Sequence, residues 1–161
     1  NRMESTMFSE FAPVSVGRRL NLLFRISMKH LRQEMKALGL VDAGDYAFIA
    51  GLFVRDGQHQ DQLSRNMQVD KSYTARAVAK LEKTGLVERR PDPEKHRIKR
   101  VFLTQKARDL EHDFFNVLKG WQNILIKGMD PKEFQIILAG LDHMLENGQN
   151  HLGIEKPEKI K

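Results

Sequence analysis

The expected fold follows mainly from one stretch, LSRNMQVDKSYTARAVAKLEKTGLVERRPDPEKHRIKRVFLT, which spans residues 63–104. A short polar helix is predicted near its start, over about 60–68, because the only apolar residues there, Leu63 and Met67, lie one turn apart. A second helix is predicted over 71–84. Two short helices that meet at a turn of a few residues are typical of a helix-turn-helix.

The residues around the second helix support its limits. Asp70 or Ser72 can cap its start, and Gly85 stands just past its end, where a left-handed conformation costs least. Residues 86–90 and 98–104 are rich in β-branched side chains and alternate, which predicts two strands. The residues between them contain prolines, which cannot donate to a strand ladder, so they form a loop. A helix-turn-helix followed by a basic two-stranded hairpin has the element order of a winged helix.

Before this core, two apolar helices are predicted. Apolar residues recur at spacings of three, four and seven over 16–38, which is typical of a long amphipathic helix. A strongly apolar helix follows from Tyr46 to Phe53, and Asp42 or Asp45 can cap it.

After the hairpin, two further helices are predicted. Thr104 can cap a long helix through Met129, and Asp130 can cap another through Leu145, with a proline at its first position. Together with the first long helix, they carry more apolar surface than a small winged core needs. They therefore pack on one another or on a second copy, and a homodimer is expected.

The predicted architecture is a mainly α-helical chain with a small β-hairpin wing. It is a winged helix-turn-helix core flanked by long N- and C-terminal dimerisation helices, in a single domain over residues 16–145. Its expected parts are a winged-helix core at about 42–104, dimerisation helices at about 16–38 and 105–145, an N-terminal extension at 1–15, and a polar, frayed tail at 147–161.

Positive charge is concentrated in one part of the chain. The 161 residues carry a formal net charge of +6. Residues 71–108 hold twelve basic and four acidic side chains, whereas the rest of the chain holds 15 basic and 17 acidic ones. This distribution indicates a surface that faces a polyanion, although a solvated charged face would give the same sum.

Several functional classes are excluded or disfavoured. The chain has no cysteine, which excludes disulfides, thiolate metal sites and cysteine nucleophiles. The longest apolar run, Tyr46 to Val54, is too short to cross a bilayer, and residues 1–11 lack the pattern of a secretory signal. A cytoplasmic protein without a membrane partner is therefore expected. The six histidines are scattered and no glycine-rich phosphate loop is present, so we expect no enzyme, no catalytic residue, no cofactor and no metal site.

The second helix of the helix-turn-helix is the candidate recognition helix. Ser72, Arg76 and Lys80 fall on one side of it, away from the apolar stripe. Arg76 can donate two parallel hydrogen bonds to guanine, and Lys80 can approach a phosphate. Lys71 and Tyr73 lie where the first residues of such a helix meet base edges or phosphates.

The hairpin supplies further cations. Arg97, at the tip beside Lys95 and His96, suits a narrow minor groove, where the negative potential is enhanced. Arg89 and other arginines and lysines on the strands are interpreted as phosphate neutralisers.

Residues 63–104 resemble the DNA-binding core of the MarR family, the multiple-antibiotic-resistance type of transcriptional regulator. With the flanking helices, the resemblance covers about residues 16–145. The elements that agree are Val69-Asp70-Lys71-Ser72, Leu81-Glu82-Lys83, Gly85-Leu86-Val87, and Arg97 with Val101, Leu103 and Thr104.

This resemblance implies an obligate dimer, two winged helices on a palindromic operator, and repression relieved by a small ligand. By position, the implied recognition residues are Lys71, Ser72, Tyr73 and Arg76, and the wing arginine is Arg97. The family usually has an acidic residue where Lys95 stands. Either the ion pair that stabilises the wing arginine is missing here, or Asp92 or Glu94 substitutes for it.

Members of the family often respond to phenolic or other aromatic acids held between the dimer helices and the winged core. The candidate ligand-binding residues are Phe24, Met28, Phe48 and Phe53, although an apolar stripe of this kind also suits an ordinary core. Two alternatives stay open: a metal-responsive regulator, and a winged helix that binds nucleic acid without sequence specificity.

Overall fold

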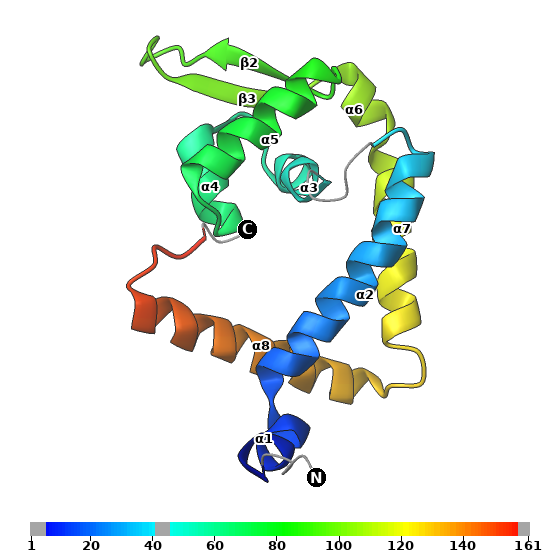
Figure 1. The fold of residues 1–161 in the computed structure, drawn as a ribbon. Helices are drawn as coiled ribbons and strands as arrows, with labels where there is room; N and C mark the ends of the chain where they lie inside the picture. The colour runs from blue at the N-terminus through cyan, green and yellow to red at the C-terminus, as the bar shows by residue number, and fades with distance from the viewer. Residues whose placement is uncertain (1–5, 41–45, 158–161) are drawn as a thin grey trace, which may run out of the picture.

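The computed structural model describes residues 6–40 and 46–157 (Figure 1). The winged-helix core lies at one end, two long helices run away from it, and a last helix crosses beneath them. The predicted caps Asp42 and Asp45 lie outside the described residues.

The winged-helix core follows the predicted order, with one additional strand. Its elements are α3 (Tyr46–Val54), β1 (Gln58–His59), α4 (Gln60–Met67), α5 (Lys71–Lys83), β2 (Val87–Pro91) and β3 (Lys99–Leu103). The helix-turn-helix and the hairpin are confirmed.

Capping fixes α5 at both ends. The Asp70 carboxylate accepts a hydrogen bond from the backbone N–H of Tyr73 at 2.7 Å, so Asp70 and not Ser72 is the cap. At the other end Gly85 has φ of 75°, the left-handed conformation predicted for it. The buried Ser64 hydroxyl donates to the Thr74 hydroxyl at 2.8 Å, which joins α4 to α5.

The wing belongs to a three-stranded antiparallel sheet with the order β1-β3-β2, so the prediction of a two-stranded hairpin is incomplete. Gln58 of β1 pairs with Val101 of β3. This strand has only two residues, too few to show alternation in the sequence. The turn before it needs glycine, because Gly57 has φ of 68° and a Cβ there would lie 2.7 Å from the Phe102 ring.

The hydrophobic core is built by these elements together with the end of α2, where Met35 is completely buried, and the start of α6 and α7. Phe48, Leu52, Leu63, Val78 and Val101 are almost completely buried within it. Apolar residues of α3, α4 and α5 therefore pack against the inner face of the sheet, and their polar sides remain outside.

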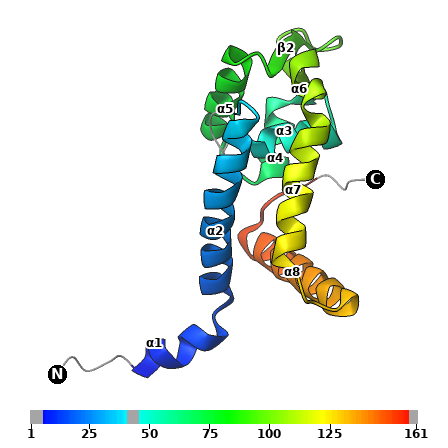
Figure 2. The same cartoon turned by 90° about the vertical axis from the view of Figure 1, so that its right-hand side faces the viewer.

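The remaining elements form the arms, which is our name for residues 6–37 and 105–152. They are α1 (Thr6–Phe11), the 3-10 helix η1 (Ala12–Val14), α2 (Val16–Ala37), α6 (Gln105–Asp109), α7 (Glu111–Leu125) and α8 (Pro131–Leu152). Both views show α2 and α7 running side by side from the core, with α8 crossing near their far end (Figures 1 and 2). Trp121 joins the pair: its indole N–H donates to the Ser27 hydroxyl at 2.9 Å, and its ring stacks on His30.

Three predictions about the arms need correction. The single helix expected from Thr104 to Met129 is divided at Leu110 into α6 and α7 and ends at Leu125. The last helix runs to Leu152, well into the segment predicted to be a frayed tail. Part of the predicted extension at 1–15 is helical, in α1 and η1. The polar residues at 147–151 continue the helix through Gly148, and the helix ends where Gly153 adopts the left-handed conformation.

Candidate nucleic-acid interface

The outer side of α5 is polar and exposed, as predicted. Ser72, Arg76 and Lys80 are exposed, while Thr74 and Val78 on the inner side are completely buried. The buried side fixes the helix on the core, so the exposed side presents its hydroxyl and cationic groups in a defined direction. This arrangement suits insertion into a DNA groove, where side chains meet base edges and phosphates.

The first turn of α5 is partly engaged with the protein itself. The Tyr73 ring is 36% exposed, and its inner face lies against Phe48 with ring centroids 5.9 Å apart. Lys71 forms an ion pair with Asp61 of α4, with Nζ and Oδ2 3.0 Å apart. Both side chains of that pair are well exposed, so a phosphate can compete for the ammonium group.

Arg89, predicted to neutralise a phosphate, is held by α5. Its Nε and Nη2 donate to Oε2 of Glu82 at 3.0 and 2.6 Å. The hydrogen bonds from Arg89 lower the pKa of Glu82, which favours the charged pair. Arg89 therefore fastens the wing to α5, the candidate recognition helix, and its role toward a phosphate stays a prediction.

A buried carboxylate organises the base of the wing. Asp92 is 2% exposed, and its Oδ2 lies 2.6 Å from both His59 Nε2 and Arg100 Nε. Its Oδ1 accepts hydrogen bonds from the backbone N–H groups of Glu94 and Lys95, each at 2.9 Å. His59 and Arg100, with these N–H groups, hold the pKa of Asp92 well below its usual range. The Asp92 cluster, meaning Asp92 with His59 and Arg100, thus joins the wing loop to β1 and β3.

The wing tip is exposed beyond this cluster. Lys95, His96 and Arg97 are all exposed, and Arg97 forms no ion pair with Asp92 or Glu94 in the described part of the chain. The proposed substitution by Asp92 or Glu94 is therefore not observed. Asp92 instead fixes the loop from which Arg97 projects.

His59 and Arg100 were not predicted as partners of Asp92. The three residues lie far apart in the sequence or on different strands, and β1, which brings His59 to the wing, is too short to be predicted. An Asp-Pro pair after a strand indicated only a turn.

The four candidate ligand-binding residues do not form one exposed group. Phe48 is 1% exposed inside the core, whereas Phe24 on α2 is well exposed. Met28 and Phe53 are partly buried; the Met28 sulfur accepts a hydrogen bond from Tyr46 at 4.0 Å, and the Phe53 ring lies against Phe114. Their role toward a ligand stays a prediction.

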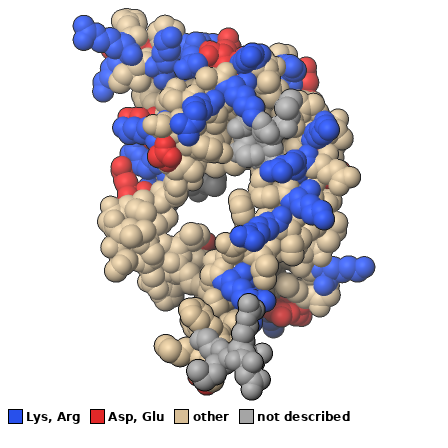
Figure 3. Space-filling model, viewed as in Figure 1, with Lys and Arg blue, Asp and Glu red and all other residues tan. Residues whose placement is uncertain are grey.

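Cationic side chains gather on one face of the molecule. Figure 3 shows lysine and arginine over the wing, over α5 and along α2 on the face in view.

Within residues 6–40 and 46–157, no three His, Asp or Glu side chains come together in an arrangement that could hold a metal ion. Among the helices that the structure describes, none is both long and apolar enough to span a bilayer.

Comparison with known proteins identifies relatives of this chain. A sequence model of the MarR family matches residues 46–99. An uncharacterized HTH-type transcriptional regulator, YybA of Bacillus subtilis (strain 168), is 27% identical over 114 residues, which cover 71% of this chain and 75% of YybA.

Solved structures share the fold across most of the chain. A MarR transcriptional regulator from Methanosarcina mazei Go1 is 32% identical, with a TM-score of 0.78 over 84% of this chain and 96% of that protein. A putative MarR family regulator from Listeria monocytogenes, solved with a 26mer DNA, is 20% identical, with a TM-score of 0.80 over 90% of this chain and 98% of that one. The second likeness concerns the fold alone.

Proposed function

This chain belongs to the MarR family of transcriptional regulators, and from that premise we propose that it is a homodimeric repressor that a small ligand releases from a palindromic DNA operator. As a member of this family the chain is a DNA-binding regulator and not an enzyme. The observation that carries the proposal is the exposed stripe of Ser72, Arg76 and Lys80 on a rigidly seated α5, next to a cationic wing.

We assign direct base readout to α5 and flank contacts to the wing. Arg76 is exposed at the middle of the polar stripe, where a guanidinium can form a bidentate contact with guanine. Lys71, Ser72 and Tyr73 lie at the start of the helix, and Lys80 lies one turn beyond Arg76. Arg97 and His96 belong to the minor-groove contact, and Arg89 to the phosphate contacts near the wing.

The proposal of a homodimer is supported by apolar residues that the single chain leaves exposed. Leu138, Leu145 and Leu152 recur every seven residues of α8, which places them on one side of the helix, and all three are exposed. Met7 and Phe8 of α1 are exposed as well. Patches of this kind on a folded protein mark an interaction site, and a second copy would cover both ends of the arms at once.

For the effector we propose a small aromatic ligand between the arms and the core. Met28 and Phe53, both partly buried on this side of the core, are the residues best placed to meet it. Phe24 would contact it from α2, and Phe48 would support it from within the core. A ligand there would change the angle between arms and core, and with it the distance between two recognition helices.

The experiment that tests the proposal is selection from random duplex DNA, followed by titration of the selected sequence against a scrambled one at several salt concentrations. We expect an inverted repeat bound by two chains, with a specificity ratio of at least about a thousandfold. Weak binding that is equal on every sequence and is lost at high salt would contradict a sequence-specific regulator and favour a non-specific winged helix.

A further inference from the structure

Basic residues form a straight line along the outer side of α2. Residues three or four apart lie on the same side of a helix, and the spacings here are four, three and four. The inner side of this helix buries Leu31 and Met35. The line, which we call the α2 stripe, consists of the exposed residues Arg25, Lys29, Arg32 and Lys36.

Within the described part of the chain, no acidic side chain pairs with the α2 stripe. Glu34 is the only acidic residue of α2, and it lies two residues from Arg32, which places it on a different side of the helix. No member of the stripe forms an ion pair with any residue in the described ranges 6–40 and 46–157. Four positive charges therefore face solvent together.

Such an arrangement is unfavourable for an isolated helix. Like charges three or four residues apart repel and destabilise the helix. A surface that serves solubility alone mixes charges of both signs, and the outer side of α2 does not. A bound polyanion would remove the repulsion.

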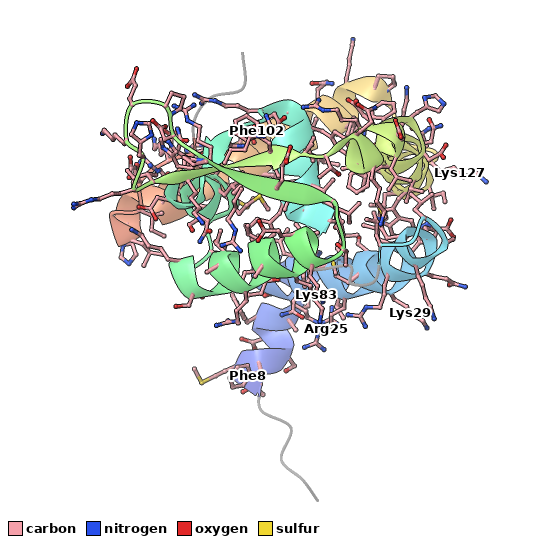
Figure 4. The ribbon with its side chains drawn as sticks, turned by 90° about the horizontal axis from the view of Figure 1, so that it is seen from above. Phe8, Arg25, Lys29, Lys83, Phe102 and Lys127 are labelled. Atoms are coloured by element: carbon pink, nitrogen blue, oxygen red, sulfur yellow. The ribbon has the colours of Figure 1, made fainter. Side chains whose placement is uncertain are left out.

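The α2 stripe lies on the same face of the protein as the proposed DNA-binding surface. Figure 3 shows cationic side chains over the wing, α5 and α2 on one face of the protein. Seen from above, Arg25 and Lys29 lie on the same side of the molecule as Lys83 at the end of α5 (Figure 4). Lys127, after α7, lies at a different edge.

The chemistry of the stripe favours a DNA backbone. From Arg25 to Lys36 the stripe extends about 16 Å, at 1.5 Å per residue. Duplex DNA presents one charge per about 1.7 Å of its axis, enough to engage all four cations, which a small anion cannot do. Single-stranded nucleic acid needs aromatic stacking platforms, and the stripe contains none.

We infer that the α2 stripe binds the phosphate backbone of the same duplex that the winged helix holds. The inference rests on the proposed DNA-binding function. It adds a contact outside α5 and the wing that raises affinity without reading sequence.

The test compares two triple variants with the wild-type chain. The first, Arg25→Gln with Lys29→Gln and Arg32→Gln, removes three charges of the stripe. The matched control, Lys119→Gln with Lys127→Gln and Lys132→Gln, removes three exposed charges from the other arm. Circular dichroism and gel filtration check that both variants keep the fold.

Affinity for the selected duplex is measured by fluorescence anisotropy between about 50 and 200 mM salt. Each lost phosphate contact reduces the slope of log K against log salt by about 0.9. Because two chains bind the proposed operator and each loses three contacts, we expect the stripe variant to lose about 5 from the slope. Its ratio of specific to non-specific affinity should stay unchanged, and the control should keep the wild-type slope.

Three results would overturn the inference. One is a stripe variant with the wild-type slope, and another is a control that loses as much as the stripe variant. The third is a stripe variant that binds the selected duplex with the wild-type affinity but fails to capture a second, differently labelled duplex or a single strand. That result would assign the stripe to another partner. If the wild-type chain itself binds no duplex, the proposed function fails. If the wild-type chain binds the duplex and the stripe variant binds it equally well, only the inference about the stripe fails.

Discussion

The recognition helix α5 buries four side chains in a single copy of the chain, whereas α8, which is much longer, buries none. The same contrast holds between the whole winged-helix core and the arms. The core is closed by caps, by the Asp92 cluster and by the Glu82 and Arg89 pair. The arms expose leucine, isoleucine and phenylalanine along most of their length.

The core and the arms therefore differ in what covers their apolar side chains. In the single chain the core already buries its apolar residues, against Met35, Ala107 and Phe114 of the adjoining arm helices. Most of the apolar residues of the arms are exposed in the single chain, so in the proposed dimer the stability and geometry of the arms depend on association. This division fits the proposed dimer, in which each DNA-reading surface stays rigid while the spacing between the two surfaces changes.

The largest expected effect is in the core. Phe48→Ala removes a ring that is 1% exposed and that lies against Tyr73. We expect the free energy of unfolding to fall by about 3 to 5 kcal/mol, measured by urea denaturation. Phe115→Ala is the control, since this ring is 55% exposed on α7. An equal loss in both variants would contradict the division between a complete core and incomplete arms.

Charged substitutions in the arms should weaken dimer formation. Leu145→Glu with Leu152→Glu places two charges on the apolar side of α8, where the side chains are 61% and 68% exposed in the single chain. If a second copy covers this side, we expect the dimer dissociation constant to rise at least about a hundredfold, near 3 kcal/mol, in sedimentation experiments. Asn147→Glu with Asn150→Glu adds the same charges on the opposite side of α8 and should leave the dimer intact. A variant that stays dimeric would show that α8 is not the interface.

On the candidate recognition helix α5, the expected effect is a smaller loss of DNA affinity together with a loss of base specificity. Arg76→Ala should cost about 1 to 3 kcal/mol on the selected operator and relax specificity at one position. Lys71→Ala serves as the comparison, because Lys71 already pairs with Asp61 and its loss should lower affinity evenly. If Arg76→Ala weakens binding equally on all sequences, Arg76 is a phosphate contact only.

The element order was predictable because it depends on local residues. Leu63 and Met67, the Asp70 cap and Gly85 are each readable from a few neighbours, and all lie where expected. The exposed and buried sides of α5 were predictable for the same reason, since Thr74, Val78 and Leu81 share one side.

The parts that were not predicted depend on distant contacts. His59 meets Asp92 only because β1 pairs with β3, and β1 has two residues. The α2 stripe was not predicted for another reason. The net charge of all residues outside 71–108 combines the basic residues of α2 with acidic residues elsewhere, and the two cancel. A sum over a long segment cannot show that like charges share one side of a helix.

The Asp92 cluster gives the core a dependence on pH. Since its neighbours lower the pKa of Asp92, the ionised carboxylate stabilises the fold. This stabilisation is complete above the ordinary pKa of 3.8 and is lost as the pH falls through the lower folded value. Asp92→Asn should therefore unfold at lower urea concentration than the wild type at pH 7, and the gap should begin to narrow below about pH 4 and close only near the lower folded pKa. A gap that stays constant into acid would contradict the role of the charge.

The smallest expected effect is at the exposed wing tip. Arg97→Ala should remove a preference for A·T-rich DNA beside the operator, because a narrow minor groove attracts an arginine that projects into it. For so exposed a side chain we expect a change of no more than about 1 kcal/mol, measured on duplexes that share the operator and differ only in their flanks. Lys95→Ala, on the same loop, should lower affinity for both flanks alike. Because the Asp92 cluster fixes the loop without contacting Arg97, Arg97→Ala should leave the unfolding midpoint unchanged. If the variant keeps the wild-type preference for A·T-rich flanks, Arg97 has no role in the minor groove.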